Sequence, residues 1–278
     1  MLLVNPPRDS LLRQLEGNGR TVTQFTQNHG DYCYLSGNEA NAAYGLLPDD
    51  CQNHSLVILH LPREKDLLSM MLHALSATMN EEAKLWLVGE NRAGIKSARR
   101  YLDKNFEQVT KLDSARHCGL FECSTPSRTD FSLKSYETLW SADFATETLP
   151  VVSLPGVFAH GHLDQGSRRL LSALEKIDPS GKVLDFACGA GVIGCAMLAR
   201  NPDIELTMSD VSSLAIESSH LTLKKNGMEA ALVASDGLSQ LEGRWDWIIS
   251  NPPFHKGVHN DLEIAASFFS TLSSTDMG

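Results

Sequence analysis

The sequence lacks the paired cysteines that mark a zinc site or a disulfide framework. It has six cysteines, but it has no Cys-x-x-Cys pair, and its histidines do not cluster near the cysteines at zinc-ligand spacing. The cysteines are Cys33, Cys51, Cys118, Cys123, Cys188 and Cys195. This scattered placement is typical of reduced thiols in a cytoplasmic protein. We therefore expect a cytoplasmic location and no metal.

Long hydrophobic runs are also missing. The longest ones, SLVILHL at residues 55–61 and WDWIIS at 245–250, are far shorter than the roughly 20 residues that cross a bilayer as a helix. The N-terminus does not show the charged and then apolar pattern of a signal peptide. These absences predict a soluble protein without a membrane partner, and we expect it to be a monomer.

An excess of positive charge is the third feature that the sequence lacks. The formal net charge is −10; residues 1–150 carry 15 basic and 19 acidic side chains, and residues 151–278 carry 9 and 15. Affinity for nucleic acid depends largely on neutralising phosphates, so neither half is a general nucleic-acid binder. Any contact with RNA or DNA is expected to come from a local basic patch.

What the sequence does contain, from Lys182 onward, is a regular alternation of strand-like and helix-like segments. Strands are predicted at residues 182–187, 204–210, 230–236 and 245–250, and helices at 192–201, 212–227 and 260–273. Short connections between alternating strands and helices imply a parallel sheet covered on both faces. This pattern predicts an α/β domain with a doubly wound, mostly parallel sheet.

The first half has a weaker version of the same pattern. Residues 55–80 and 83–106 each predict a strand followed by a helix, and LLVNPPRDSLLRQL at residues 2–15 predicts a first strand that leads into a first helix. This similarity indicates an internal repeat, so we expect two Rossmann-like domains, at residues 1–128 and 129–278. The stretch rich in Ser, Thr and Asp from about residue 125 to 150 is expected to connect them.

The sequence also stops early for a doubly wound domain. After FFSTLSSTDMG such a domain should have further strands, and none follow. We therefore expect the second sheet to be truncated at its C-terminal end and to lack one edge.

A glycine turn and three acidic residues follow successive strands of the second half. In VLDFACGAG, Asp185 ends a strand, and Gly189 and Gly191 allow a ligand to approach the backbone at the start of a helix. Asp210 lies at the distance where a carboxylate binds a ribose diol, and Asp236 could bind an adenine amine. Each feature alone is equally an ordinary helix cap or turn. Their order along the chain favours a nucleotide-like ligand.

The fourth strand narrows the choice of ligand. Gly194 completes a G-x-G-x-x-G pattern, so the glycines alone do not exclude NAD. In NPPF, however, the Asn251 carboxamide can accept a hydrogen bond from a planar amine, and Phe254 offers a face for stacking. Pro252 and Pro253 stiffen the loop and leave the Pro252 carbonyl as a second acceptor. A rigid turn is the structural alternative; after the glycine turn and the acidic residues, amine chemistry is favoured.

Together DFACGAG, the SD pairs at 209–210 and 235–236, and SNPPFH resemble the class I S-adenosylmethionine-dependent amino-methyltransferases. LWLVGENRAGIKSARRYL, KLDSARHCGLF and LPGVFAHGHLDQGSRRLL further resemble the ribosomal RNA small subunit methyltransferase C family, guanine-N2 methyltransferases of 16S rRNA. This resemblance covers most of the chain. It implies that the active domain begins near residue 150. It also implies that the first domain is a degenerate methyltransferase copy that supports folding or holds RNA.

The resemblance also implies roles for particular residues. Asp185, Gly189 and Gly191 would contact the methionine end of S-adenosylmethionine, Asp210 its ribose and Asp236 its adenine. Asn251, Pro252, Pro253 and Phe254 would form the catalytic loop that seats the guanine. Asp164, Gly166 and Ser167 would close over the cofactor, or they would form an ordinary capped helix start. The family usually has glycine where this sequence has Ala187.

Two further expectations concern contacts with RNA and the first NPP motif. Lys96, Arg99, Arg100 and Lys104 fall at helical spacing and are the best local candidates for RNA contacts, although a solvated helix face is the alternative. The first NPP motif, at Asn5, follows a first strand and no glycine loop, so only Asn251 is expected to be catalytic.

Two rival functions remain from the sequence. One is methylation of another planar amine, namely 23S rRNA guanine N2, adenine N6 or a protein glutamine. The other is a non-catalytic RNA-binding or assembly module with a relic cofactor pocket.

Overall fold

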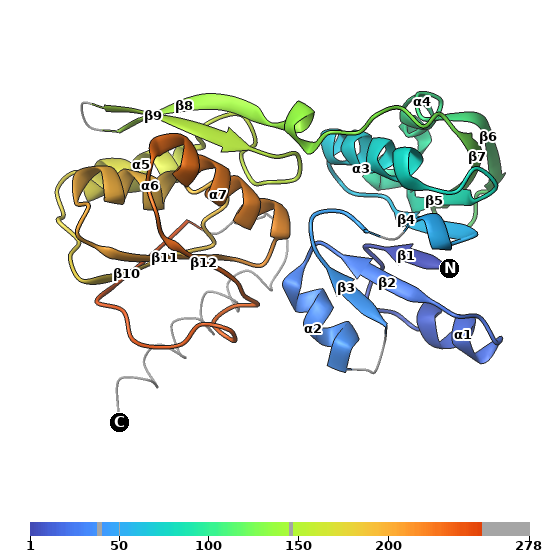
Figure 1. The fold of residues 1–278 in the computed structure, drawn as a ribbon, viewed down its shortest axis with the longest axis horizontal. Coiled ribbons are helices and arrows are strands. Elements are labelled where there is room, and N and C mark those ends of the chain that lie inside the picture. Colours follow the sequence, from blue (N-terminus) through green and yellow to red (C-terminus); the bar gives the residue numbers. More distant parts are fainter. Residues whose placement is uncertain (38–40, 50, 145–146, 252–278) are drawn as a thin grey trace. The chain divides into compact units, whose positions relative to one another are not determined.

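The chain divides into two units by the contacts between its residues (Figure 1). The computed structural model describes residues 1–37, 41–49, 51–144 and 147–251. Unit 1 comprises Met1–Thr138 and Leu154–Gly156, and unit 2 comprises Leu139–Ser153 and Val157–Gly278. The domain boundary between residues 128 and 129 stays a prediction.

Unit 1 is built on a seven-stranded sheet. Its strands are β1 (Leu2–Val4), β2 (Thr23–Thr26), β3 (Ala42–Tyr44), β4 (Leu56–His60), β5 (Lys84–Glu90), β6 (Phe106–Asp113) and β7 (Cys118–Pro126). The order is β3-β2-β1-β4-β5-β7-β6. The pairs among the first five strands are parallel, and β7 is antiparallel to both β5 and β6. The expected Rossmann-like, mostly parallel sheet is therefore confirmed.

Among the helices of unit 1, α3 (Lys65–Thr78) carries the main buried apolar stripe. The helices are α1 (Leu11–Gly17), α2 (His29–Gly37), α3 and α4 (Arg99–Leu102), with the short 3-10 helices η1 (Cys51–Asn53), η2 (Asn91–Ala93), η3 (Ile95–Ser97) and η4 (Leu133–Tyr136). In α3 the buried residues Leu68, Met71, Leu72 and Leu75 recur at intervals of three and four, which places them on one helix face. They share a core with the buried side chains of β4 and β5, so α3 anchors the centre of unit 1.

Unit 2 contains a four-stranded parallel sheet and a two-stranded sheet. The elements are β8 (Thr138–Phe144), β9 (Glu147–Ser153), α5 (Gln165–Leu174), β10 (Lys182–Phe186), α6 (Val192–Arg200), β11 (Glu205–Asp210), α7 (Ser213–Asn226), β12 (Ala231–Ala234) and β13 (Trp247–Ser250). The larger sheet has the order β12-β11-β10-β13. Its four strands and the helices α6 and α7 confirm the segments predicted from the sequence. The helix predicted at 260–273 lies outside the described residues.

The four-stranded parallel sheet of unit 2 has the same strand order as the first four strands of the sheet in unit 1. Strands β3-β2-β1-β4 of unit 1 correspond to β12-β11-β10-β13 of unit 2, and all of these strands pair in parallel. By this correspondence β1 is equivalent to β10, and β4 is equivalent to β13. The internal repeat suggested by the sequence is therefore present at the level of topology.

The stretch from residue 125 to 150, which was expected to connect the two domains, has structure of its own. It contains η4, all of β8 and the start of β9. Thr222 Oγ1 on α7 accepts a hydrogen bond from Val152 N and donates one to Val152 O, both at 3.1 Å, so β9 is fixed to α7 (Figure 1). The helix predicted within residues 83–106 is reduced to η3 and the four-residue α4.

Candidate active site

The predicted site residues of unit 2 are gathered at the carboxyl ends of its parallel strands. Phe186 at the end of β10 pairs with Ser209 on β11 and with Ser250 on β13. The glycine loop, residues 187–191, follows β10 directly, and Asn251 follows β13 directly. Because β10 and β13 are neighbours, the loop and Asn251 lie next to each other at the carboxyl ends of the strands. This is where open α/β sheets bind ligands.

The glycine loop turns by using left-handed backbone conformations. Ala187, Gly189 and Gly191 have φ angles of 58°, 56° and 80°. A Cβ at Gly191 would lie 2.9 Å from Met208 Cε and 3.1 Å from the backbone Cα of Ser219, whereas a Cβ at Gly189 would have nothing within 4 Å. Gly191 is therefore required for packing, and Gly189 leaves open space beside the backbone.

Ala187 adopts a conformation that costs a residue with a Cβ about 1 kcal/mol or more. Replacing Ala187 with glycine is therefore expected to stabilise unit 2 by about 0.5–1 kcal/mol, after allowance for the greater freedom of glycine in the unfolded chain. Urea unfolding would measure this difference.

Ala190→Gly is the matched control for the Ala187 change. Ala190 is buried in the same loop, and it is not among the residues with positive φ. Its replacement is expected to destabilise the protein. A loss of stability in Ala187→Gly of the same size as in Ala190→Gly would contradict the strain argument.

Asp185 is buried and ties β10 to α6. The whole residue is only 1% exposed, and Gly194 N donates a hydrogen bond to Asp185 Oδ2 at 2.9 Å. Burial raises the pKa of Asp185 to about 7; the Gly194 hydrogen bond opposes this shift, and the nearby charge of Asp210 adds to it. In this conformation the Asp185 carboxyl group therefore holds the start of α6 against the end of β10.

The raised pKa of Asp185 predicts a pH dependence of stability. The folded state holds this proton up to about pH 7, whereas the ordinary pKa of a free aspartate carboxyl group is 3.8. The group therefore stabilises the fold most below pH 4, and its contribution falls between pH 4 and 7 by at most about 1.4 kcal/mol per pH unit. Asp185→Asn keeps an oxygen acceptor for Gly194 but cannot ionise. The difference in unfolding free energy between this variant and the parent is expected to change across that range.

Asp178→Asn provides the comparison for the pH experiment. This carboxylate is 74% exposed, in the same unit. The variant gives the effect of the same chemical change at an exposed position. A difference for Asp185→Asn that does not change between pH 4 and 7 would contradict the raised pKa of Asp185.

Asp210 and Asp236 end the next two strand regions. Gly189 N donates to Asp210 Oδ2 at 3.1 Å and Ser212 N donates to Asp210 Oδ1 at 2.9 Å, while burial raises the pKa of Asp210. Asp236 is exposed, and its backbone N–H donates to Gln240 Oε1 at 2.9 Å. The structure thus brings Asp210 against the glycine loop and leaves the Asp236 carboxylate open to solvent.

The start of α5 completes this edge of unit 2. Asp164 is the N-cap of α5, and its carboxylate accepts hydrogen bonds from Gly166 N at 2.8 Å and from Ser167 N at 3.3 Å. Asn251 Nδ2 lies 3.0 Å from Ser167 Oγ and 3.3 Å from Asp164 Oδ2. The capped helix start considered from the sequence is therefore present, and it lies directly against Asn251. Pro252, Pro253 and Phe254 lie outside the described residues.

Within the described ranges, no group of three or more His, Cys, Asp or Glu side chains is arranged to hold a metal ion. No helix in the same part of the chain is long and apolar enough to cross a membrane.

Comparison with known families matches both halves of the chain. The model described as "Methyltransferase small domain N-terminal" matches residues 1–139, and the model described as "Methyltransferase small domain" matches residues 148–274. The chain belongs to the methyltransferase small domain family. The two matched segments leave only residues 140–147 between them.

Relatives within the methyltransferase small domain family cover nearly the whole chain. The Ribosomal RNA small subunit methyltransferase C of Pseudomonas entomophila is 38% identical over 265 residues, which are 95% of this chain and 77% of the relative. The protein of the same name from Aliivibrio salmonicida is 37% identical over 93% of this chain and 76% of the relative. A solved Thermus thermophilus 16S rRNA N2 methyltransferase has a TM-score of 0.81 at 22% identity, covering 92% of this chain and 71% of that chain. It shows that the fold is shared.

In this methyltransferase small domain chain, the first NPP motif, at Asn5, occupies a different place from the one at Asn251. Asn5 follows β1, the strand equivalent to β10, so it lies where unit 2 has its glycine loop. Its side chain forms a clasp with Gln27: Asn5 Nδ2 donates to Gln27 Oε1 and Gln27 N donates to Asn5 Oδ1, both at 3.0 Å. The clasp joins the ends of β1 and β2, so Asn5 has a structural function.

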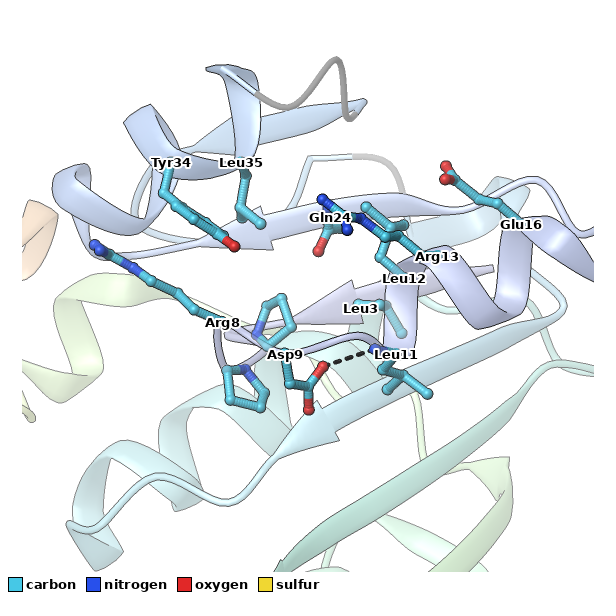
Figure 2. Close-up of a pocket in the computed structure, with 12 residues that line it drawn as sticks. Leu3, Arg8, Asp9, Leu11, Leu12, Arg13, Glu16, Gln24, Tyr34 and Leu35 are labelled. Atoms are coloured by element: carbon cyan, nitrogen blue, oxygen red, sulfur yellow. Dashed lines mark hydrogen bonds between the residues drawn. The ribbon is translucent and has the colours of Figure 1, made fainter.

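The prolines that follow Asn5 border a pocket of unit 1 (Figure 2). Besides Pro6 and Pro7, the pocket is lined by Leu3, Arg8, Asp9, Leu11, Leu12, Arg13, Glu16, Gln24, Tyr34 and Leu35. These residues come from α1, α2, β1, β2 and the loop after β1. The two prolines of the first NPP motif therefore form part of the wall of this pocket, which lies between the helices and the sheet.

The basic residues proposed for RNA do not share one helix face. The four side chains are Lys96, Arg99, Arg100 and Lys104. Lys96 belongs to η3, Lys104 follows α4, and only the two arginines are in α4. Arg99 pairs with Asp103 at 3.5 Å, and Arg100 lies 4.8 Å from the ring centroid of Tyr101. The helical-face argument was wrong because the helix is a single turn; the RNA contact stays a prediction.

One residue that supports the site was missed from the sequence. Ser219 Oγ on α7 donates to Gly189 O at 3.0 Å and lies 3.3 Å from Cys188 Sγ, so it fixes the glycine loop from 30 residues away. The run of buried small side chains on α7, which includes Ser218 and Thr222, is the signal that could have indicated a close approach.

Proposed function

We propose that the chain transfers a methyl group from S-adenosylmethionine to the exocyclic N2 of a guanine in 16S rRNA. Family membership and relatives named Ribosomal RNA small subunit methyltransferase C, at 36–40% identity, support the activity. The observation that carries the proposal is the position of Asn251 directly after β13, beside the strand that carries the glycine loop. This places an amide next to a nucleotide-type loop.

The residues at this edge fit S-adenosylmethionine. Gly189 leaves space beside the backbone, Asp210 presents a carboxylate next to that space, and Asp236 is exposed one strand further along. We assign the ribose to Asp210, the adenine to Asp236, and the methionine end to Gly189, Gly191 and Asp185. When bound, the cofactor supplies an electrophilic methyl group on a sulfonium.

Asn251 is the residue to which we assign the substrate amine. Its carboxamide oxygen can accept a hydrogen bond from a planar NH₂ group, and this fixes the direction of the nitrogen lone pair. The chemistry needs positioning more than acid-base catalysis, because the methyl group is already activated. Pro252 and Phe254 are assigned to the same loop by the family resemblance, as second acceptor and as stacking surface, with Pro253 stiffening the turn.

Unit 1 is assigned a supporting function. The Asn5–Gln27 clasp occupies the strand ends that carry the glycine loop in unit 2, which supports a degenerate copy without cofactor binding. Lys96, Arg99, Arg100 and Lys104 remain our candidates for contacts to RNA phosphates. The substrate base must leave its stack to reach Asn251 if it is paired, which costs a few kcal/mol. We further propose that the protein acts as a monomer in the cytoplasm.

Mapping the methyl acceptor tests this function. The protein is incubated with methyl-labelled S-adenosylmethionine and, in parallel, with protein-free 16S rRNA, 23S rRNA and assembled small subunits. The RNA is then digested to nucleosides. Label in N2-methylguanosine from small-subunit RNA is the expected result. Label in N6-methyladenosine, in 23S rRNA alone, or in a protease-sensitive fraction would contradict it. A calorimetric titration with S-adenosylmethionine that detects no binding would indicate a relic pocket.

A further inference from the structure

The amide group of Asn251 is surrounded by hydrogen-bond acceptors from the start of α5. Asn251 Nδ2 lies 3.0 Å from Ser167 Oγ, 3.3 Å from Asp164 Oδ2 and 3.4 Å from Asp164 Oδ1. An ionised carboxylate can only accept hydrogen bonds, so the Asn251 atom that faces it must be the nitrogen. The neighbours on α5 therefore determine which end of the carboxamide is nitrogen and which is oxygen.

Asp164 is itself held in place, and it stays charged. Its carboxylate accepts hydrogen bonds from the backbone of Gly166 and Ser167. Burial acts to raise the pKa of Asp164, but the hydrogen bonds from Ser167, Gly166 and Asn251 outweigh it and lower the pKa. A rigid, ionised acceptor at the N-terminus of a helix is a firm support for an amide donor.

Gly166 leaves the space that the Asn251 carboxamide occupies. A Cβ at Gly166 would lie 2.5 Å from Asn251 Oδ1 and 3.0 Å from Asn251 Nδ2. Any larger residue would have to displace the amide or the helix start. The segment Asp164, Gly166 and Ser167 is thus shaped around Asn251 as well as around its own helix cap.

We propose that Asp164 and Ser167 are positioning residues that hold the Asn251 carboxamide through its nitrogen and so fix its oxygen as the acceptor for the substrate amine. The proposal rests on the proposed function, because it gives Asn251 the task of binding that amine. It differs from the cofactor contact inferred from family resemblance: a cofactor contact would affect the affinity for S-adenosylmethionine, whereas a positioning contact affects the rate of transfer.

Asp164→Asn is the most selective variant. Asparagine caps helices as well as aspartate does, so α5 should keep its start. The new amide, however, places a second NH₂ group toward Asn251 and removes the ionised acceptor. We expect kcat to fall at least tenfold, with KM for rRNA and Kd for S-adenosylmethionine changed less than threefold. Ser167→Ala should act in the same direction, and Gly166→Ala should lower kcat by displacing the amide. A Kd for the cofactor that weakens more than tenfold with kcat intact would overturn the proposal.

Asp9→Asn is the matched control. Asp9 accepts a hydrogen bond from Leu11 N at 2.9 Å at the start of α1 in unit 1, so the same chemical change is made at a helix start far from Asn251 in sequence. Its kcat is expected to equal that of the parent. A tenfold loss in this control would show that the assay reports helix capping in general.

Exchanging the carboxylate and the amide between Asp164 and Asn251 tests their contact independently of methyl transfer. Asn251→Asp places a second carboxylate against Asp164 and is expected to lower Tm. The double variant Asp164→Asn/Asn251→Asp restores one donor and one acceptor, and it is expected to recover most of that loss in Tm. No recovery would overturn the proposed contact, whatever the activity. Recovery of Tm in a protein whose parent form methylates no RNA would instead contradict the proposed function.

Discussion

Replacing Asn251 with alanine is expected to lower methyl transfer by at least about a hundredfold while leaving the affinity for S-adenosylmethionine within a few fold of the parent. The loss is large because a preorganised hydrogen-bonding group at a reacting centre is typically responsible for factors of about 100–1000 in rate. Cofactor affinity is spared because the residues assigned to the cofactor belong to the β10, β11 and β12 ends. The measurements are single-turnover transfer to small-subunit RNA and calorimetric titration with the cofactor.

The chain provides its own control for this variant. Asn5→Ala changes the same residue in the same Asn-Pro-Pro context, but at the end of β1 in unit 1. Loss of the two hydrogen bonds to the nearly buried Gln27 is expected to destabilise unit 1 by about 1–2 kcal/mol. Transfer per folded molecule should be unchanged. Full activity of Asn251→Ala, or an equal loss in both variants, would reject the assigned role of Asn251.

The contrast between these two motifs shows what local sequence can and cannot predict. Both Asn-Pro-Pro stretches follow an apolar run, and the tripeptide alone does not distinguish them. Their order among the strands does, because Asn251 follows β13, a neighbour of the strand with the glycine loop, whereas Asn5 follows β1, the equivalent of that loop-bearing strand itself. The prediction that only Asn251 is catalytic used this order. It stays a prediction; the structure shows that the Asn5 side chain is hydrogen-bonded to Gln27.

The elements of unit 2 could be predicted because their patterns are simple. Strands β10 and β11 lie inside a parallel sheet: β10 has adjacent apolar residues at Val183 and Leu184, and β11 buries Leu206 and Met208. Gly227 ends α7 in a left-handed conformation. Strand β6 was missed because only Phe106 at its start is buried and most of its remaining side chains are exposed. Strands β8 and β9 were missed because polar residues there suggested a connection.

Contacts between distant residues explain what the sequence could not predict about the site. Asp164 was recognised as a cofactor residue or a helix cap, but its contact with Asn251 joins positions 87 residues apart. The tether from Asp185 to Gly194 likewise depends on how α6 returns over β10. Such contacts follow from the register of the strands and the direction of the helices, and no single motif contains that information.

Replacing Gly191 with alanine is expected to destabilise unit 2 by about 2–5 kcal/mol and to abolish cofactor binding. The left-handed φ of 80° already costs a residue with a Cβ about 1–2 kcal/mol. The added methyl group would also lie 2.9 Å from Met208 Cε and 3.1 Å from Ser219 Cα, and the second contact is to backbone that cannot turn away. Overpacking of this kind adds about 1–3 kcal/mol. Urea unfolding gives the loss of stability, and calorimetry gives the loss of binding.

Gly189→Ala separates the two effects, because it shares the left-handed backbone without the packing clash. Its φ is 56°, and an added Cβ would have nothing within 4 Å. We expect a stability loss of only about 1–2 kcal/mol. The methyl group would project into the space assigned to the cofactor, so the affinity for S-adenosylmethionine should still fall about tenfold or more. Equal stability losses in the two variants would show that α6 can shift away from Met208. Unchanged affinity in Gly189→Ala would mean that the cofactor lies elsewhere on this edge of the sheet.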